Sequence, residues 1–298
     1  MRDFALAKIE RKISRTQYPQ HDELRHKFHG SPDDYIRLLE STKKLIPLLA
    51  SHPMITRSSS PVLWHADLHL GNIFVSAQDP TSVEGIIDWQ SSLIAPMFLQ
   101  CRVPVFLEPP KDYVRGAEAP KLPDDFDQLD TIEQQRAILQ RDLATRWKLY
   151  EMYTLINNLD VYNALRVDRR LWEPFARCGQ SRHDDIVPLR SCLIRVFNDW
   201  ELLEMSGECP FAFTKDELQM HEKESKQYQD RVYLQNLARD QLRTDDEGWV
   251  PLREWEAVRA ENQRLNGMFV DTMAGEMSKE EAMKMWPFCD DESLTTST

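Results

Sequence analysis

The chain has 298 residues, of which 41% are hydrophobic and 29% are charged, as in an ordinary globular protein. Its formal net charge of −12 and the lack of a dense Lys/Arg cluster exclude nucleic acid as a main partner, because nucleic-acid binding needs a basic face. No stretch reaches the roughly 18 consecutive apolar residues that cross a bilayer, so we expect no membrane span.

The residues before Arg57 are predicted to be mainly helical, and Arg57 to Pro61 is predicted to be a loop. A loose apolar stripe at helical spacing marks the first segment, and it consists of Phe4, Leu6, Ile9 and Ile13. A second helix should begin at Ser31, which is suited to the N-cap and is followed by Pro32 and two acids. Because proline cannot donate a backbone hydrogen bond, we expect Pro47 to kink this helix or end it early.

Three short apolar strands are predicted next, and they span Val62–Trp64, Ile73–Val75 and Val83–Trp89. A polar loop joins the first two strands. Residues 104–125 should be irregular because they contain five prolines. The chain after about residue 130 is predicted to be helical. It includes a long helix from Thr131 to about Leu159 and another from Val187 to Met205.

Two capping boxes predict later helix starts, Thr214 with Glu217 and Ser278 with Glu281. We therefore expect a mainly α fold with a small β element (α+β). It comprises loops at residues 61–100, a helical wrap over 130–290 and a frayed tail over 291–298. The five cysteines are scattered, which favours a reducing compartment over a disulfide framework.

The most informative residues are Asp67, Asn72 and Asp88, which lie in polar segments flanked by apolar strands. Phosphoryl transfer needs a carboxylate that accepts the proton of the nucleophile, and oxygen ligands that hold Mg²⁺ against the nucleotide phosphates. One amide oxygen and one carboxylate suffice, because Mg²⁺ keeps several water ligands. Asp67, Asn72 and Asp88 fit these roles in that order.

The string His65-x-Asp67-x-x-x-x-Asn72 followed by Ile87-Asp88 resembles the catalytic loop and metal-binding aspartate of the aminoglycoside phosphotransferase and choline kinase group. This group has a protein-kinase-like fold. The resemblance implies that Asp67 is the catalytic base, supported by His65 within the catalytic loop. It further implies that Asn72 and Asp88 bind Mg²⁺ and thereby the co-substrate ATP.

The longer string Leu63–Val75, with Ile87–Gln90 and Ala95-Pro96, is most similar to the fungal "altered inheritance of mitochondria" branch of phosphotransferase-like proteins. Complete members carry an upstream lobe with a β-sheet, a phosphate-covering loop and an ATP-binding lysine. Here Gly30 is the sole glycine before Gly71, so no glycine-rich loop precedes the catalytic loop. We therefore expect residues 1–298 to form one kinase-like C-terminal lobe without the ATP-binding lobe.

The expected activity is ATP- and Mg²⁺-dependent phosphorylation of an unknown small-molecule hydroxyl, impaired by the absent lobe. The alternative is a non-catalytic, pseudokinase-like binding or scaffold protein. A third class, a metal hydrolase, would use His65-x-x-x-His69 with Asp67 as zinc ligands. The expected location is the cytoplasm or, by resemblance alone, the mitochondrion.

Two acids among the later helices, Glu151 and Asp199, are candidates to bind a cationic substrate if the family's pocket lies beside them. The aromatic residues Trp147, Tyr150 and Tyr153 share one helix face and are more simply explained as core than as a ligand site.

Overall fold

The computed structural model describes residues 2–17, 31–90, 92–179, 186–245 and 248–288. The chain divides into two compact units, Met1–Ala212 and Phe213–Thr298. The described residues are mainly helical with four short strands, which confirms the predicted mainly α fold with a small β element. The prediction of a single lobe over residues 1–298 stays a prediction, and the expected frayed tail at 291–298 lies outside the described residues. None of the described helices is both long enough and apolar enough to cross a bilayer.

The first unit contains most of the secondary structure. Its helices are α1 (Arg2–Gln17), α2 (Pro32–Ser51), α3 (Pro53–Arg57), α4 (Met97–Gln100), α5 (Thr131–Asn157), α6 (Leu159–Leu165), α7 (Arg169–Gly179) and α8 (Ile186–Asn198). Its strands are β1 (Pro61–Trp64), β2 (Ile73–Val75), β3 (Val83–Ile86) and β4 (Leu93–Pro96).

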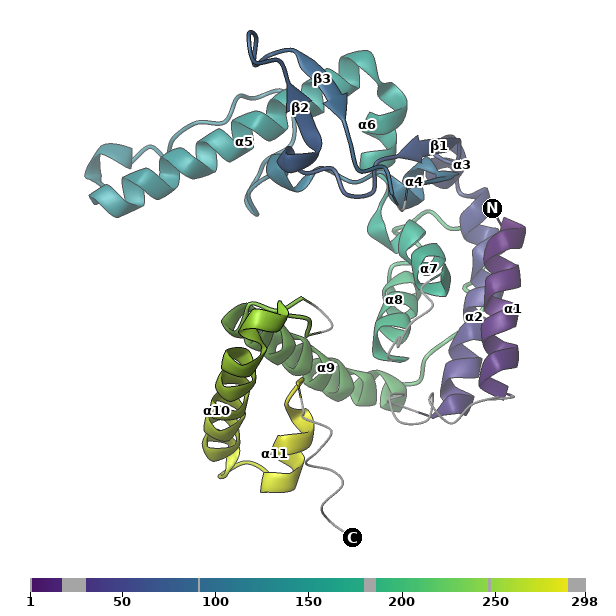
Figure 1. The fold of residues 1–298 in the computed structure, drawn as a ribbon. Helices are drawn as coiled ribbons and strands as arrows, with labels where there is room; N and C mark the ends of the chain where they lie inside the picture. The colour runs from purple at the N-terminus through teal and green to yellow at the C-terminus, as the bar shows by residue number, and fades with distance from the viewer. Residues whose placement is uncertain (1, 18–30, 91, 180–185, 246–247, 289–298) are drawn as a thin grey trace. The chain divides into compact units, whose positions relative to one another are not determined.

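Helices α1, α2, α7 and α8 pack side by side (Figure 1). Each contributes an apolar face, and the fully or nearly fully buried side chains include Ile9 of α1, Leu38, Leu39, Leu45, Ile46 and Leu49 of α2, Leu171 of α7, and Leu193 and Val196 of α8. The predicted stripe in the first helix is therefore partly right. Ile9 is buried, whereas Phe4 is 64% exposed. The burial of these faces explains why residues 2–17 and 31–51 are helical.

Helix α2 begins where the sequence predicts, with Ser31 at the N-cap and Pro32 in the first turn. The expected early end at Pro47 is wrong, because the helix continues to Ser51 with the proline inside it, and the expected kink stays a prediction. Leu45 and Leu49 are fully buried on either side of Pro47. Their packing compensates for the hydrogen bond that proline cannot donate.

A buried carboxylate links α7 to α8. Glu173 is 2% exposed, and its carboxylate lies 2.9 Å from Arg169 Nη2, 3.2 Å from Arg177 Nη2 and 2.5 Å from Arg195 Nη2. Burial alone would raise the pKa of Glu173, but the hydrogen bonds from Arg169 and Arg195 outweigh it and hold the pKa below its ordinary value. The ionised carboxylate is therefore part of the folded state.

We expect Glu173→Gln to lower the free energy of unfolding at pH 7 by about 3 kcal/mol, because three guanidinium groups lose their shared anion. Since the folded-state pKa is depressed, this contribution is complete above the unfolded pKa and disappears as pH falls through the folded pKa. Urea unfolding at pH 7 and at acidic pH should show the two proteins converging in acid. The exposed pair Glu261–Arg264 supplies the control, Glu261→Gln, which should change stability little at either pH.

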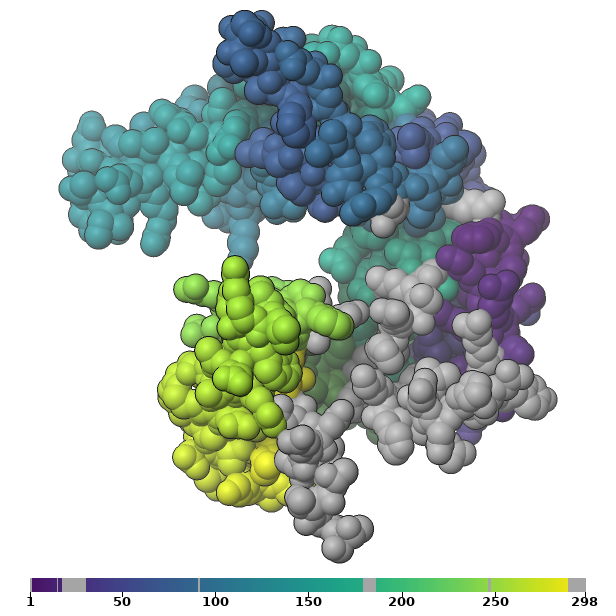
Figure 2. Space-filling model, in the orientation of Figure 1, coloured from purple at the N-terminus to yellow at the C-terminus, as the bar shows by residue number. Residues whose placement is uncertain are grey.

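The β element consists of two separate antiparallel pairs. β1 pairs with β4, with Pro61 opposite Pro96, and β2 pairs with β3, with Ile73 opposite Ile86. The three predicted strands are present, although β3 ends at Ile86 instead of Trp89. The fourth strand, β4, was not predicted. The β2–β3 hairpin stands at the surface of the unit (Figure 2).

Helix α5 spans Thr131–Asn157, close to the predicted bounds. Its N-cap is Asp130, whose carboxylate accepts hydrogen bonds from the backbone N–H groups of Ile132 and Glu133, both at 2.8 Å. The preceding residues 104–125 contain one short 3₁₀ turn, Val105–Leu107, and are otherwise irregular, as the prolines predict. This irregular segment packs along α5, where Tyr113 contacts the ring of Trp147.

The second unit contains α9 (Lys215–Leu242), α10 (Trp255–Met273) and α11 (Lys279–Met285). The capping boxes predicted at Thr214 and Ser278 are both present. Asn262 of α10 is buried and links α10 to the residues that follow α11. It accepts a hydrogen bond from Trp286 Nε1 at 2.7 Å and donates one to the carbonyl of Phe288 at 2.8 Å.

Candidate functional site

The loop between β1 and β2 is closed by Asn72, which is 5% exposed. Its side-chain Nδ2 donates to the carbonyl of Asp67 at 2.9 Å, and its backbone N–H donates to the carbonyl of His69 at 3.0 Å. Its own carbonyl accepts from the backbone N–H of Ile87 at 3.0 Å. Asn72 therefore connects both ends of the loop and ties them to the residue before Asp88.

His65 connects the same two segments from the other side. It is 9% exposed, and its Nε2 lies 2.8 Å from the carbonyl of Ile87. Its ring meets that of Trp89 edge-on, with 4.8 Å between the ring centroids. These contacts fix the start of the loop against the Asp88 segment, and the supporting role of His65 stays a prediction.

The two aspartates differ from His65 and Asn72 in being exposed. Neither the Asp67 nor the Asp88 side chain has a hydrogen bond or ion pair among the described residues. Asp88 also has a φ of 63°, a left-handed conformation that L-residues adopt at a cost in free energy. Both carboxylates are thus held on ordered backbone with their oxygens unoccupied by the protein.

The hydrogen bonds bring the four predicted residues into one local network. Asn72 bonds to Asp67 directly, and both Asn72 and His65 bond to Ile87, the neighbour of Asp88. Two uncompensated carboxylates on adjacent segments create a negative potential that favours a cation. The Asn72 amide uses its Nδ2 within the loop, and its Oδ1 accepts no hydrogen bond from the described residues. The Asp88 carboxylate and the Asn72 amide oxygen are donor types that suit Mg²⁺.

The zinc-hydrolase alternative finds no support in the loop geometry. His65 Nε2 faces a backbone carbonyl, and His69 Nδ1 accepts the backbone N–H of Gly71 at 3.1 Å. In the part of the chain that the structure describes, no three His, Cys, Asp or Glu side chains gather so as to hold a metal. A Mg²⁺ site built on Asn72 and Asp88 is of a different kind, because nucleotide and water oxygens would complete it. Gly71 allows the His69 ring to lie close to the backbone of the loop, since a Cβ at this position would be 3.0 Å from the ring.

The two acids proposed to bind a cationic substrate already have partners. Glu151 is 7% exposed and accepts a hydrogen bond from Tyr113 Oη at 2.6 Å. Asp199 lies 2.7 Å from Arg170 Nη1. These pairings make both carboxylates parts of the folded protein and weaken the expectation that either one recognises a cation.

Two contributors to the site escaped the sequence reasoning. Trp89 packs on His65 and donates from Nε1 to the carbonyl of Ile86 at 2.9 Å, and only its position after Asp88 could have indicated this role. Gln100 of α4 donates from Nε2 to the carbonyls of Val62 in β1 and Ala95 in β4. Gln100 thereby links β1 to β4 just before the loop that holds Asp67 and Asn72, and no local sequence pattern indicates that contact.

Comparison with known proteins supports the resemblance seen in the sequence. Residues 4–99, which include the whole network, match the Phosphotransferase enzyme family. Two curated fungal proteins, subtelomeric hrmA-associated cluster proteins from two strains of Aspergillus fumigatus, are each 29% identical to the chain over 272 residues. The match covers 88% of this chain but 52% of each relative, so the chain spans about half the length of the curated relatives it matches. No solved structure matches the chain.

The family match and the geometry agree on which part of the chain carries the resemblance. The matched range contains His65, Asp67, Asn72 and Asp88, together with the strands that hold them. The assignment to the "altered inheritance of mitochondria" branch stays a prediction. At the coarse level that the comparison reaches, residues 4–99 are similar to the kinase-like phosphotransferase enzyme family.

Proposed function

We propose that the chain carries the catalytic loop of an ATP- and Mg²⁺-dependent phosphotransferase that acts on a small-molecule hydroxyl. The observation that supports this most strongly is the network joining Asp67, Asn72 and the Asp88 segment through Ile87. It places two unpaired carboxylates and an amide oxygen on neighbouring ordered segments, as transfer of a phosphoryl group requires. The match of residues 4–99 to phosphotransferases points to the same chemistry.

In this proposal Asp67 orients the acceptor hydroxyl and takes its proton while the acceptor oxygen bonds to the γ-phosphorus of ATP. The bond from that phosphorus to the β–γ bridging oxygen breaks, and ADP leaves. Asn72 Oδ1 and the Asp88 carboxylate would hold Mg²⁺, which offsets the charge on the phosphate oxygens when bound. His65 positions both segments without contacting the reacting atoms, since its Nε2 faces the Ile87 carbonyl.

A second candidate is a non-catalytic binding or scaffold protein built on the same network. One observation favours it: the described residues upstream of β1 form the helices α1, α2 and α3 and no strand. The sheet that grips ATP in complete relatives is therefore not formed by these residues. The absence of an ATP-binding lobe, the identity of the acceptor and the location in cytoplasm or mitochondrion stay predictions.

The decisive test is metal-dependent ADP release. The purified chain would be incubated with ATP, Mg²⁺ and a panel of sugars, choline, amino acids and aminoglycosides. We expect one acceptor class to stimulate ADP formation, EDTA to reduce the rate at least about a hundredfold, and excess Mg²⁺ to restore it.

Two other outcomes would contradict the proposal. Stimulated ADP release that is insensitive to EDTA would exclude the metal role of Asn72 and Asp88. If no acceptor stimulates release although the chain binds Mg²⁺ in calorimetry, the second candidate replaces the first.

A further inference from the structure

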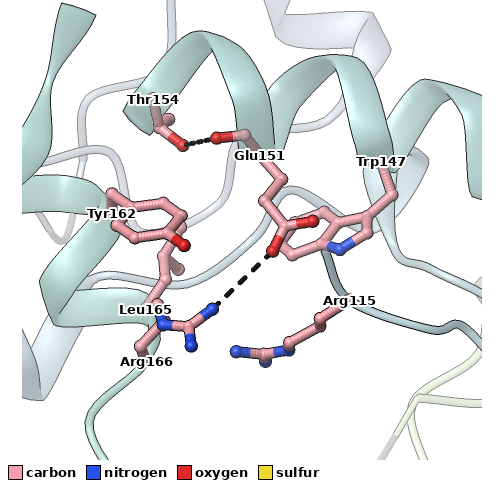
Figure 3. A pocket seen from close by; sticks show the side chains of 7 residues that line it. All are labelled: Arg115, Trp147, Glu151, Thr154, Tyr162, Leu165 and Arg166. Atoms are coloured by element: carbon pink, nitrogen blue, oxygen red, sulfur yellow. Dashed lines mark hydrogen bonds and ion pairs between the residues drawn. The ribbon is translucent and has the colours of Figure 1, made fainter. Parts of the chain in front are cut away.

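A pocket outside the catalytic network lies between α5, α6 and the irregular segment that precedes α5 (Figure 3). It is lined by Arg115, Trp147, Glu151, Thr154, Tyr162, Leu165 and Arg166. The lining thus combines two aromatic side chains, two guanidinium groups and one carboxylate. A surface of this composition suits a small molecule with a planar part and a charged part.

The carboxylate of the pocket is already compensated. Glu151 Oε2 accepts a hydrogen bond from Tyr113 Oη at 2.6 Å and lies 3.6 Å from Lys148 Nζ. Burial, followed by the hydrogen bond to Glu151, raises the pKa of Tyr113, so its hydroxyl keeps the proton that it donates. Glu151 Oε1 lies a longer 3.8 Å from Arg166 Nη1. The negative charge of Glu151 is therefore shared among protein groups.

Three hydrogen-bond donors at the pocket are less well satisfied. Arg115 has no hydrogen bond or ion pair among the described residues, and the only ion pair of Arg166 there is the long one to Glu151. The indole Nε1 of Trp147 is buried and has no acceptor, although the residue is only 5% exposed. A buried donor without an acceptor is uncommon in folded proteins and indicates a missing partner. The buried Trp147 donor lacks an acceptor, and the exposed guanidinium groups of Arg115 and Arg166 can donate to an incoming oxygen.

The charge around the pocket also favours an anionic ligand. Arg115, Lys148 and Arg166 together carry three positive charges against the one negative charge of Glu151, in a chain whose formal net charge is −12. In Figure 3 the guanidinium groups of Arg115 and Arg166 both extend to the same side of the Glu151 carboxylate. A local excess of positive charge at a partly buried pocket favours an anion.

The position of Arg115 is set by the protein. Lys148 Nζ donates to the carbonyls of Val114 at 3.3 Å and Gly116 at 2.6 Å, the two neighbours of Arg115. Gly116 has a φ of 126°, in a region that glycine adopts without strain. Lys148 therefore holds the backbone on both sides of Arg115 while also offsetting Glu151. Lys148, which is buried, thus both offsets the charge of Glu151 and fixes the backbone that carries Arg115.

We propose that this pocket binds the oxyanion of a small aromatic or otherwise planar molecule, a carboxylate or a phosphate group. The guanidinium groups of Arg115 and Arg166 and the indole N–H of Trp147 would donate to its oxygens, in charge-assisted hydrogen bonds. The half-buried ring of Tyr162, over which the Arg166 guanidinium lies at 5.1 Å from the ring centroid, would contact its planar part. The proposal does not depend on phosphoryl transfer, since it concerns only groups outside the catalytic loop.

Calorimetric titration at low ionic strength with matched probes tests the proposal. Benzoate and phenyl phosphate carry an anion on a ring, benzamide is a neutral counterpart of benzoate, and inorganic phosphate lacks the ring. We expect benzoate or phenyl phosphate to bind at least about tenfold more tightly than benzamide. Which of the two binds more tightly identifies the oxyanion, and inorganic phosphate measures the contribution of the ring. Tighter binding of tetramethylammonium would overturn the proposal and assign the pocket to a cation at Glu151.

Substitutions locate the binding. Arg115→Gln should weaken the preferred anion about tenfold, whereas Arg146→Gln, the same change on the exposed face of α5, should leave its affinity unchanged. Trp147→Phe keeps a ring and removes the N–H, so affinity should fall several-fold. Thermal melts would establish that each variant is folded. Because Arg115 is exposed and unpaired, its variant should fold even if Trp147→Phe does not. Equal anion affinity in wild type and Arg115→Gln would overturn the proposal.

Discussion

Asp88→Gly is expected to lose metal binding while being more stable than Asp88→Ala by about 1 kcal/mol, because position 88 has a φ of 63°. Glycine adopts this left-handed conformation without the steric cost of a Cβ, whereas alanine keeps that cost. Both substitutions remove the only carboxylate that follows β3 in this segment. Removal of a proposed metal ligand should weaken the binding of Mn²⁺, used as a probe for Mg²⁺, at least about a hundredfold.

The measurements are Mn²⁺ titration by electron paramagnetic resonance and urea unfolding on the same preparations. Glu204 supplies a matched control, since it is an acidic residue of the first unit with a φ of 54°. Glu204→Gly should leave Mn²⁺ binding unchanged. If Asp88→Gly binds Mn²⁺ as tightly as wild type, Asp88 is not a ligand and the proposed reaction loses its metal site.

Asp67→Asn is expected to lower the rate of phosphoryl transfer by about 10²- to 10⁴-fold, the usual contribution of a general base. The fold should not change, because Asn72 bonds to the backbone carbonyl of Asp67 and not to its carboxylate. Mn²⁺ binding should weaken far less than in Asp88→Gly. This division between rate and metal affinity would distinguish the base from the ligand.

The rate would be measured as acceptor-stimulated ADP release under saturating Mg²⁺ and ATP. Asp79→Asn is a suitable control, since Asp79 accepts hydrogen bonds from Thr81 in the β2–β3 turn and an amide oxygen can replace its carboxylate there. Wild-type turnover in Asp67→Asn would show that another group takes the proton, and it would remove the main reason for assigning the base.

The loop between β1 and β2 could be proposed as a site because the pattern that indicates it is local in the sequence. Asp67 and Asn72 lie five residues apart, and short apolar strands flank them, so the chemistry and its support share one stretch of sequence. The helix starts at Ser31, Thr214 and Ser278 were predictable for the same reason, since a cap is recognised within four residues.

The remaining features depend on contacts between distant residues. Strand β4 exists because Leu93 pairs with Trp64 and Ile94 pairs with Leu63. The side chains of Leu93 and Ile94 are both exposed, so no alternation of apolar and polar residues predicts this strand. Pro47 remains inside a helix because its neighbours are buried against other helices. The pocket depends on Lys148 reaching the carbonyls of Val114 and Gly116, more than thirty residues upstream. Its charge balance could not be read from the positions of its arginines alone.

The left-handed backbone at Asp88 also bears on how such a loop would evolve. The exposed Asp88 side chain has no hydrogen bond or ion pair among the described residues and occupies a conformation that glycine or asparagine adopts more readily, so folding gives no evident reason to retain it. Asn72, in contrast, is needed for the loop to close. In a lineage released from selection for catalysis, we expect drift to replace residue 88 first, with glycine or asparagine, and to spare the asparagine that closes the loop.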